Sequence, residues 1–368
     1  MQKLLTICIP TYNRAKFLRR LLEQIEQESS GLHAQMEVAV SDNASDDDSQ
    51  KVLAEFASRL PLRTGRNPAN LRYDANVLAA VMLAKGRFAW LMGDDDLFIP
   101  GRLREVFELL KTAPEDLGGF FTNYYRGPSQ LGLDLRAEGL RLYSKTEHDA
   151  DFFKATYGAN FIGCVILDSA LCQDLISKHT RLDGIRVMKT NLQTEEVVFK
   201  DFVQAYLTLE CVMRSARFGI YSKPCVAFGG DGSYATQEQA LRSAQKTAMY
   251  MRHFRTFYPS LFNYRACPFS SANLGGLARY LVLFDPAMPA EHQALFYQAA
   301  AELMAEYKAN GDWWWLAYRL AIGLHRHVFF LPPLMHFAYV TAVHARGRKT
   351  YMEREREKQA AGLRESQL

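Results

Sequence analysis

The chain has 368 residues, of which 48% are hydrophobic and 23% charged, and its formal net charge is +4. A chain of this length and ordinary globular composition buries a sizeable core, so we expect one large catalytic domain with an appendage. The six cysteines include no Cys-x-x-Cys pair and lie mostly in apolar runs, which argues against a zinc site and a disulfide framework.

The same features favour a reduced, cytoplasmic setting. The apolar run from Leu4 is interrupted by residues 10–13 before it reaches the length of a secretory signal. The chain shows no internal repeat, low-complexity linker, zinc-finger spacing or Walker phosphate loop, and we expect no nucleic-acid partner. The sequence does not indicate an oligomeric state.

The first 125 residues alternate between strand and helix patterns. Residues 4–9 form an apolar run that Pro10 is expected to end, and residues 14–28 carry apolar side chains at helical spacing. The elements predicted after them are a strand over 36–40, a helix carrying Val52, Leu53 and Phe56, a weak strand near 62–64, a helix over 74–84, a strand over 88–92 and a helical pattern after Pro100. This alternation implies a parallel sheet with ligands at the carboxyl ends of its strands.

Three polar clusters follow these strands, at Thr11, at Asp42 and at Asp94–Asp96. Because the strands are predicted to be parallel, we expect the clusters to converge on one crevice. Three adjacent carboxylates at a strand end do not all stay ionised without cations, so they predict a hard-cation site able to hold a diphosphate. A solvated acidic turn is the alternative.

Four motifs in this region resemble the inverting family 2 glycosyltransferases, which have the GT-A nucleotide-sugar fold. They are Ile9–Arg14, Ser41–Asp47, Asn67–Asn76, and Gly93–Asp96 with Pro100 and Leu103 behind. The motifs at Asp42 and at Gly93–Asp96 are most similar to abequosyltransferase-like enzymes of O-antigen assembly. The family usually has glycine after Asn-Leu, where this chain has Arg72.

The resemblance implies an α/β GT-A fold with a mostly parallel central sheet and a metal-dependent donor site that uses Mg²⁺ or Mn²⁺. The donor-binding residues that it indicates are Pro10, Thr11, Tyr12, Arg14, Asp42, Asn43, Arg72, Asn76 and Asp94. The residue types agree, because Tyr12 can lie against a pyrimidine face while Thr11 and Asp42 can bond base and ribose edges. A turn aromatic and a helix cap are the structural alternatives.

The sequence allows two assignments of the metal ligand within the acidic run. Counting back from Pro100, as the resemblance suggests, makes Asp94 the ribose partner and Asp95 the principal metal ligand, whereas an Asp-x-Asp reading makes Asp96 the ligand. Arg14, Arg72 and Asn76 are candidates for supplementary phosphate or base contacts. An arginine that opens a helix is also commonly just solvated.

Inverting transfer needs a general base on the acceptor side, where the family commonly has an acidic pair. The nearest equivalent is Glu195 with Glu196, at the start of a predicted helix, and Asp201 is a weaker candidate. Acidic residues in a first helical turn also favour the macrodipole without any catalytic role. Residues 228–233 are glycine-rich and are either a loop that closes over the diphosphate or an exposed turn.

The predicted organisation is a donor-binding half over 1–125, an acceptor-binding half of the same domain over 126–235, and a helical region over 236–368. Within the acceptor half, residues 161–167 are predicted to form a buried strand and residues 197–213 a helix or a helix–strand pair.

The last region has an unusual charge pattern. From Trp313 to Met352 there is no Asp or Glu, and cations alternate with aromatic residues. This pattern predicts docking of segment 313–352 on an anionic membrane surface, and packing on the catalytic domain or a dimer contact is the alternative.

The function that these observations predict is inverting transfer of a sugar from a nucleotide-sugar donor to a hydroxyl of a surface glycan or lipid-linked acceptor. Two other functions remain open. A sugar nucleotidyltransferase has a similar fold but usually carries a glycine-rich, basic loop after its first strand, which Thr11–Arg14 does not provide. A catalytically silent glycan-binding scaffold fits if the acidic pair is not a base.

Overall fold

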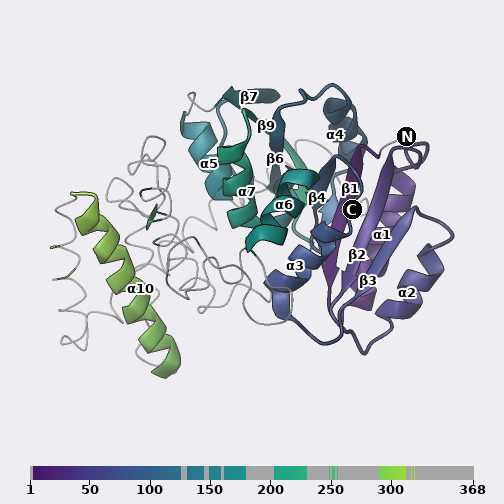
Figure 1. Cartoon of the computed structure of the whole chain (residues 1–368), viewed down its shortest axis with the longest axis horizontal. Helices are drawn as coiled ribbons and strands as arrows, with labels where there is room; N and C mark the ends of the chain where they lie inside the picture. Colours follow the sequence, from purple (N-terminus) through teal and green to yellow (C-terminus); the bar gives the residue numbers. More distant parts are fainter. Residues whose placement is uncertain are drawn as a thin grey trace, which may run out of the picture. The chain divides into compact units, whose positions relative to one another are not determined.

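The computed structural model describes residues 3–125, 131–144, 149–158, 161–179, 203–229 and 290–311, with positions 248, 251, 252, 255, 316 and 319. The chain divides into two compact units, Met1–Gly232 and Ser233–Leu368. The first unit is a sheet with helices on both faces (Figure 1). A mixed α/β architecture was predicted, and the sheet and its helices confirm it.

The N-terminal half of the sheet is parallel. Its strands lie in the order β3-β2-β1-β4, with the bounds β1 Leu5–Thr11, β2 Met36–Asp42, β3 Leu62–Arg66 and β4 Phe88–Leu91. Consecutive parallel strands are joined through helices, so their carboxyl ends all lie at one edge. The predicted convergence of the polar clusters depends on this half.

The sheet continues beyond β4 with mixed pairing. Strand β8 (Val165–Asp168) is antiparallel to β4, β6 (Leu117–Tyr125) is antiparallel to β8, and β9 (Arg217–Ala227) is parallel to β6. Two short strands, β5 (Leu97–Phe98) and β7 (Leu140–Ser144), pair antiparallel with β9. Because β5 directly follows the acidic run, its pairing holds that run against the end of β9.

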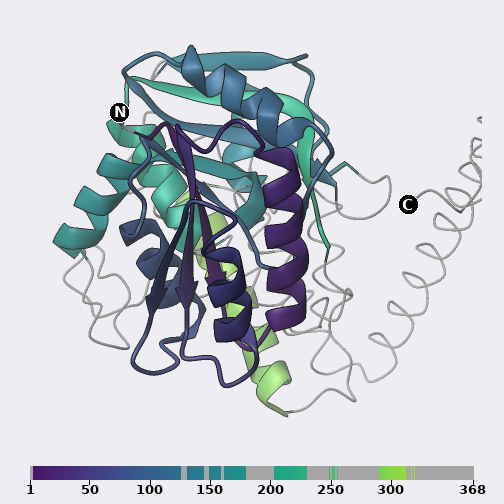
Figure 2. The ribbon, with the colours of Figure 1, turned by 90° about the vertical axis from the view of Figure 1, so that its right-hand side faces the viewer.

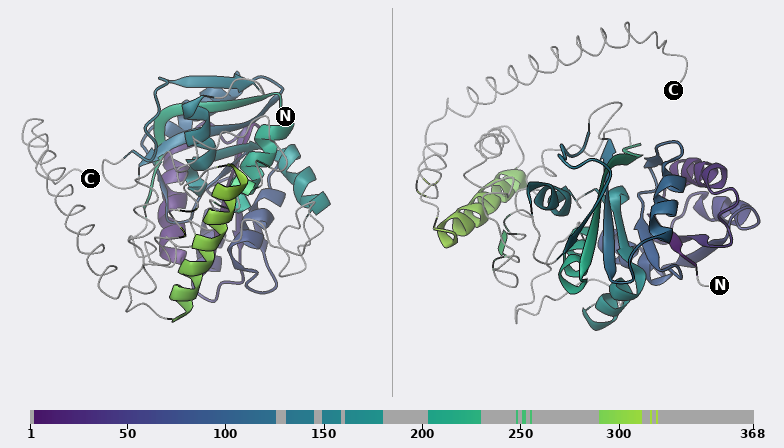
Figure 3. Two further views of the ribbon diagram at one scale, coloured as in Figure 1. Left: turned by 90° about the vertical axis from the view of Figure 1, so that its left-hand side faces the viewer. Right: turned by 90° about the horizontal axis from the view of Figure 1, so that it is seen from above.

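Helices cover both faces of the sheet, as Figures 2 and 3 show. On one face lie α1 Ala15–Glu28, α2 Ser49–Phe56 and α4 Arg102–Lys111, and on the other α3 Arg72–Met82, α6 Ser169–His179 and α7 Val203–Arg214. Helix α5 (Ala150–Gly158) contacts α7 and β6, and the short 3₁₀ helix η1 (Ile162–Cys164) precedes β8.

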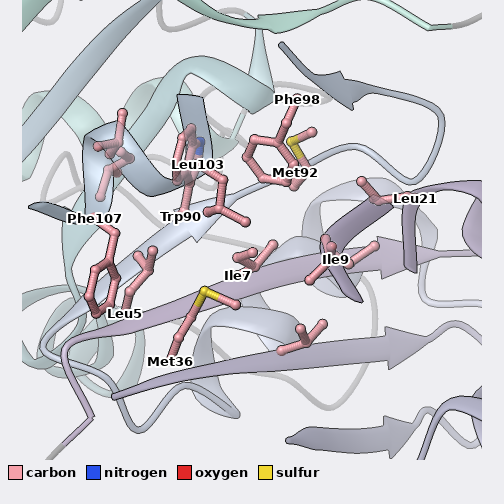
Figure 4. Close-up of a cluster of buried hydrophobic side chains, with 14 of the residues drawn as sticks. Leu5, Ile7, Ile9, Leu21, Met36, Trp90, Met92, Phe98, Leu103 and Phe107 are labelled. Atoms are coloured by element: carbon pink, nitrogen blue, oxygen red, sulfur yellow. The ribbon is translucent and has the colours of Figure 1, made fainter. Parts of the chain in front are cut away.

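The core between the sheet and α1, α2 and α4 explains why these segments fold as they do. Alternate residues of each strand point to this face, and Leu18, Leu21, Leu22 and Ile25 form the buried stripe of α1. Trp90 and Phe98 meet edge to face with ring centroids 4.9 Å apart, beside Met92 (Figure 4). The acidic run is therefore bracketed by buried residues on either side.

Two predicted elements differ from the structure. Strand β1 continues through Pro10, which pairs with Ser41, instead of ending there. Pairing with β4 has already ended at Cys8 and Leu91, and the missing N–H of Pro10 lies on that unpaired side. The predicted strand over 161–167 begins with the η1 turn, and only its second half pairs in the sheet.

The second unit is described chiefly through α10, Ala290–Ala309. Its buried Glu306 accepts hydrogen bonds from Arg252 Nε at 3.0 Å and Arg255 Nη2 at 2.8 Å. Among the described helices, none is both long enough and apolar enough to cross a membrane. Apart from Leu316 and Arg319, the segment 313–352 lies outside the described residues.

Candidate active site

The carboxyl ends of the first three strands bring the predicted polar residues into register. Thr11 of β1 lies opposite Asp42 of β2, and Asp42 lies opposite Arg66 of β3. The chain after β4 reaches the same edge with Gly93–Asp96. The three polar clusters at Thr11, Asp42 and Asp94–Asp96, which are far apart in the sequence, therefore meet at one place, as predicted.

The acidic run forms a tight turn in which Asp96 N–H donates to the carbonyl of Gly93 at 3.2 Å. The turn needs glycine at its start, because a Cβ on Gly93 would lie 2.7 Å from Oδ2 of Asp96 and 3.2 Å from Oδ1 of Asp95. All three carboxylates are buried, with exposures of 4%, 8% and 2% for Asp94, Asp95 and Asp96. The alternative of a solvated acidic turn does not describe these side chains.

Asp94 and Asp95 are held by residues from the end of β1 and the start of α1. The Thr11 hydroxyl donates to Oδ2 of Asp94 at 2.7 Å. Arg14 donates through Nη2 to Oδ2 of Asp95 at 2.8 Å, and its Nη1 lies 3.4 Å from Oδ1 of Asp94. Burial raises the pKa of Asp94 to about 7, although Arg14 and Thr11 oppose the rise. One guanidinium thus faces a row of three carboxyl groups.

Asp96 differs from its neighbours because its Oδ1 atom is buried and has no hydrogen-bond partner among the described residues. Burial, and then the nearby charge of Asp95, raise its pKa well above the usual value, against a hydrogen bond from the Gly229 N–H. A buried carboxyl with an unpaired oxygen is costly unless a ligand completes it. Asp96 is therefore the residue of the acidic turn whose hydrogen bonding is left incomplete among the described residues.

Two buried asparagines tie the donor-side loops together. Asn76 donates to the Thr11 carbonyl at 3.1 Å and accepts from the Ser41 hydroxyl at 2.7 Å. Asn43 donates to the Arg72 carbonyl at 3.2 Å and accepts from Leu71 N–H at 2.9 Å. Both residues were predicted to bind the donor, and in the structure their side chains shape the loop between β3 and α3.

Asp42 is more constrained than its predicted role suggests. Its side chain is fully buried, Oδ1 accepts from the Ser45 N–H at 3.0 Å, and Oδ2 accepts from Arg66 at 2.9 Å and from Gln50. These bonds hold the turn after β2. Three of the four acceptor positions of this carboxylate are therefore already used within the protein.

Tyr12 and Arg72 are the predicted donor residues that face solvent. Tyr12 is 41% exposed directly after β1, and Arg72 is exposed at the start of α3. Arg72, Asn13 and Ala44 have φ angles of +68°, +53° and +63°, and they are the non-glycine residues with positive φ in the described part of the chain. All three lie in the loops at this edge, where such backbone angles gather around ligand sites.

Two further contacts to the acidic turn were not predicted. Arg20 of α1 donates to the carbonyl of Asp95, and Gly229, just after β9, lies against the same carbonyl. Arg20 is six residues beyond Arg14, and its helical spacing alone does not distinguish it from a solvated arginine.

Other predicted residues are not described. Glu195, Glu196 and Asp201, and residues 230–233 of the glycine-rich loop, lie outside the described residues. In the described ranges, no group of three or more His, Cys, Asp or Glu side chains is arranged to hold a metal ion. The described cysteines, Cys8, Cys164, Cys172, Cys211 and Cys225, are buried free thiols.

Together the fold and the convergence of these motifs have the architecture of the GT-A fold that the sequence predicted. Residues 6–165 match the family described as Glycosyl transferase family 2. The solved structure of residues 1–349 of S. aureus TarS has a TM-score of 0.50 at 15% identity, over 88% of this chain and 91% of that one. At this identity the likeness bears on the fold alone.

Two curated relatives match shorter stretches. Abequosyltransferase RfbV of Salmonella typhimurium is 38% identical over 95 residues, which are 25% of this chain and 28% of the relative. An uncharacterized glycosyltransferase of Haemophilus influenzae is 27% identical over 111 residues, 30% of this chain and 36% of the relative. The matches span about a third of the length of these relatives. The predicted resemblance to family 2 glycosyltransferases and to abequosyltransferase-like enzymes is confirmed.

Proposed function

We propose that this chain is a metal-dependent, inverting glycosyltransferase that moves a sugar from a nucleotide-sugar donor to a hydroxyl of a surface glycan or lipid-linked acceptor. The observation that carries the proposal is the row of buried carboxyl groups at the carboxyl edge of the parallel strands, where Asp96 Oδ1 is unpaired. The family match of residues 6–165 and the similarity to an abequosyltransferase support it.

The acidic turn fits a divalent cation. Mg²⁺ and Mn²⁺ prefer oxygen ligands, and such ions are commonly held by one or two carboxylates together with substrate phosphates. Thr11 and Arg14 occupy oxygens of Asp94 and Asp95, which leaves Asp96 as the carboxylate with a buried unpaired oxygen. We therefore assign Asp96, together with Asp95, as the residues that would hold Mg²⁺ or Mn²⁺. The bound cation would offset the charge of the diphosphate as the leaving group forms.

The chain's own residues would bind and orient the donor. Tyr12 offers an exposed aromatic face for the base, and Arg72 offers an exposed guanidinium for phosphate or sugar oxygens. Asn43 and Asn76 fix the loop that presents Arg72, and Asp94 remains the candidate for the ribose hydroxyl. The loop and the Asp94 carboxyl are held by hydrogen bonds before the donor arrives, which lowers the entropy lost on binding.

Inverting transfer also requires removal of the acceptor proton. We assign this role to Glu195 or Glu196, which precede α7 in the chain. The position of α7 supports this assignment, because the Asp74 Oδ1 atom in the first turn of α3 accepts a hydrogen bond of 3.1 Å from the N–H of Val203, the first residue of α7. Glu196 is seven residues before Val203 in the sequence.

A lipid-linked acceptor would lie at a membrane, and the acid-free, aromatic-rich segment 313–352 would dock there on the cytoplasmic face. This part of the proposal rests on the charge and aromatic pattern of the sequence.

The proposal is tested by incubating the full chain with a panel of nucleotide sugars, with and without Mn²⁺. We expect thermal stabilisation by one nucleotide class in the presence of Mn²⁺, and slow release of the nucleoside diphosphate from its sugar conjugate. Neither stabilisation nor hydrolysis with any uridine, guanosine, cytidine or thymidine diphosphate sugar would overturn it.

A further inference from the structure

Arg20 bridges two parts of the chain that are far apart in sequence. Its Nη2 atom donates to the carbonyl of Asp95 at 2.8 Å and to the carbonyl of Gly229 at 3.1 Å. The first carbonyl belongs to the acidic turn, and the second belongs to the residues that leave β9. A single guanidinium nitrogen therefore fastens the end of β9 to the acidic turn.

The approach at this point is so close that residue 229 must be glycine. A Cβ on Gly229 would lie 2.0 Å from the carbonyl oxygen of Asp95 and 2.7 Å from Nη2 of Arg20. Gly229 thus lies against the main chain of Asp95 and is held there by its own carbonyl, which accepts from Arg20.

The orientation of Arg20 is set by its own helix. The Phe17 ring lies beside both arginines that reach the acidic turn, at 4.8 Å from the guanidinium carbon of Arg14 and 5.6 Å from that of Arg20. The neighbouring Arg19 points elsewhere and forms two hydrogen bonds with Glu55, at 2.8 and 2.6 Å. Arg19 and Arg20 are therefore a matched pair on α1, of which only Arg20 reaches the acidic turn.

We propose that Arg20 is a positioning residue for the cation and donor site: it holds Gly229 on the acidic turn and so fixes the main chain of that turn at Asp95. This inference rests on the proposed function and names a residue outside the donor and metal sets. Without Arg20, the carbonyls of Asp95 and Gly229 would lie near each other with no shared donor. Their repulsion would move Gly229 away, and the acidic turn would lose its contact with the end of β9 at the Asp95 carbonyl.

The test compares Arg20→Gln, Arg20→Lys and the matched control Arg19→Gln. Each variant is titrated with Mn²⁺ in the presence of UDP or GDP. The electron paramagnetic resonance signal of the free ion then gives the Mn²⁺ affinity of the variant. Removing a residue that orients a metal ligand typically weakens metal affinity by about 10- to 100-fold. We expect that loss in Arg20→Gln, partial recovery in Arg20→Lys, and affinity like that of the unmodified protein in Arg19→Gln.

A second measurement does not depend on any ligand. Amide hydrogen exchange of the peptide containing residues 225–229 should be faster in Arg20→Gln than in Arg19→Gln, because Gly229 after β9 no longer accepts a hydrogen bond from Arg20. Equal exchange in the two variants would overturn the inference even if no nucleotide binds. Unchanged Mn²⁺ affinity in Arg20→Gln would overturn it as well. A different result would overturn the proposed function: the unmodified protein binds neither Mn²⁺ nor nucleotide, yet exchange is faster in Arg20→Gln. Arg20 would then have a structural role alone.

Discussion

The Thr11 hydroxyl donates a hydrogen bond of 2.7 Å to Oδ2 of Asp94, across 83 residues of sequence. This bond joins the end of β1 to the acidic turn after β4, and both partners are buried. Replacing Thr11 with valine keeps the shape but leaves the Asp94 oxygen without its donor. A lost hydrogen bond to a charged group is worth about 1.5–3 kcal/mol. We expect Thr11→Val to lower nucleotide affinity by at least tenfold, measured by calorimetry with Mn²⁺.

The neighbouring Thr6 provides a control. It lies in the same strand and donates to Glu37 at 3.0 Å, at the opposite end of the parallel strands. Thr6→Val should lower stability without changing nucleotide affinity. Equal nucleotide affinity in Thr11→Val and the unmodified protein would contradict the role of Asp94 in the donor site.

Asp96→Asn should abolish Mn²⁺-dependent nucleotide binding and transfer without lowering the melting temperature. The native carboxyl is buried with an unpaired oxygen, so a neutral amide of the same shape removes an unfavourable charge. Asp95→Asn should also abolish transfer. Asp48→Asn, at an exposed carboxylate paired with Lys51, is the control and should retain activity. Full activity in both Asp95→Asn and Asp96→Asn would show that the turn does not hold the cation.

The assignment of the general base predicts a separation of binding from turnover. Glu195→Gln or Glu196→Gln should lower kcat by about 10² or more while donor affinity stays nearly unchanged. Steady-state kinetics with saturating acceptor and calorimetry with the donor nucleotide measure the two effects. Normal turnover in both variants would direct the search to Asp201 or Asp231.

Arg72 has a positive φ angle, so its replacement is expected to change stability through the backbone and donor affinity through the lost side chain. A non-glycine residue in this region costs about 1–2 kcal/mol relative to its usual conformation. Arg72→Gly should therefore be more stable than Arg72→Ala, by about 1 kcal/mol in urea unfolding, because glycine adopts this angle readily. Both variants should lose donor affinity equally if the guanidinium contacts the donor. If both bind as well as the unmodified protein, Arg72 lies outside the donor site.

Glu105 of α4 predicts a loss of stability in acid. Partial burial disfavours its charge, but hydrogen bonds from Tyr221, Lys223 and Arg102 outweigh burial and lower its pKa to about 2. The unfolded chain binds this proton at a pKa of about 4.3, so the contribution is full above that pH and disappears as the pH falls towards about 2. Because the group is about one-third exposed, we expect the contribution to be only about 1 kcal/mol.

Urea unfolding between pH 6 and pH 2 measures this contribution. Glu105→Gln should show a smaller decrease in the free energy of unfolding over this range than the unmodified protein. Glu108→Gln, which removes a surface pair with Lys111 on the same helix, should follow the unmodified protein. Parallel curves for all three proteins would show that the contacts of Glu105 do not stabilise the fold.

The parallel half of the fold was predictable because its elements, apart from the weak strand near 62–64, have strong local patterns. Apolar runs ending in polar residues located Thr11, Asp42 and the acidic turn, and the topology of alternating elements placed them together. Strands β6 and β9 were not predicted. Strand β6 contains Gly118 and Gly119, which disfavour a strand locally but are required here, since added Cβ atoms would lie 2.2 Å from Ser215 and 2.6 Å from Phe218.

The finer roles within the site depend on contacts that no local pattern records. The sequence suggested Asp42 as a donor ligand, and only the structure shows its carboxylate already bound by Arg66 and Ser45. Arg20 was missed because its partners are backbone carbonyls, and any residue type supplies those. Long-range contacts to the main chain are set by the packing of β9 on the acidic turn, which sequence spacing does not encode.

The register of Thr11, Asp42 and Arg66 across three parallel strands bears on how such a protein can diverge. A deletion of one residue within β2 would turn Asp42 to the opposite face of the sheet, because strand side chains alternate. Insertions in the loops beyond the strand ends would leave that alignment untouched. Lineages descended from this chain are therefore expected to gain and lose residues after positions 11, 42 and 66, while the lengths of the strands leading to them stay constant.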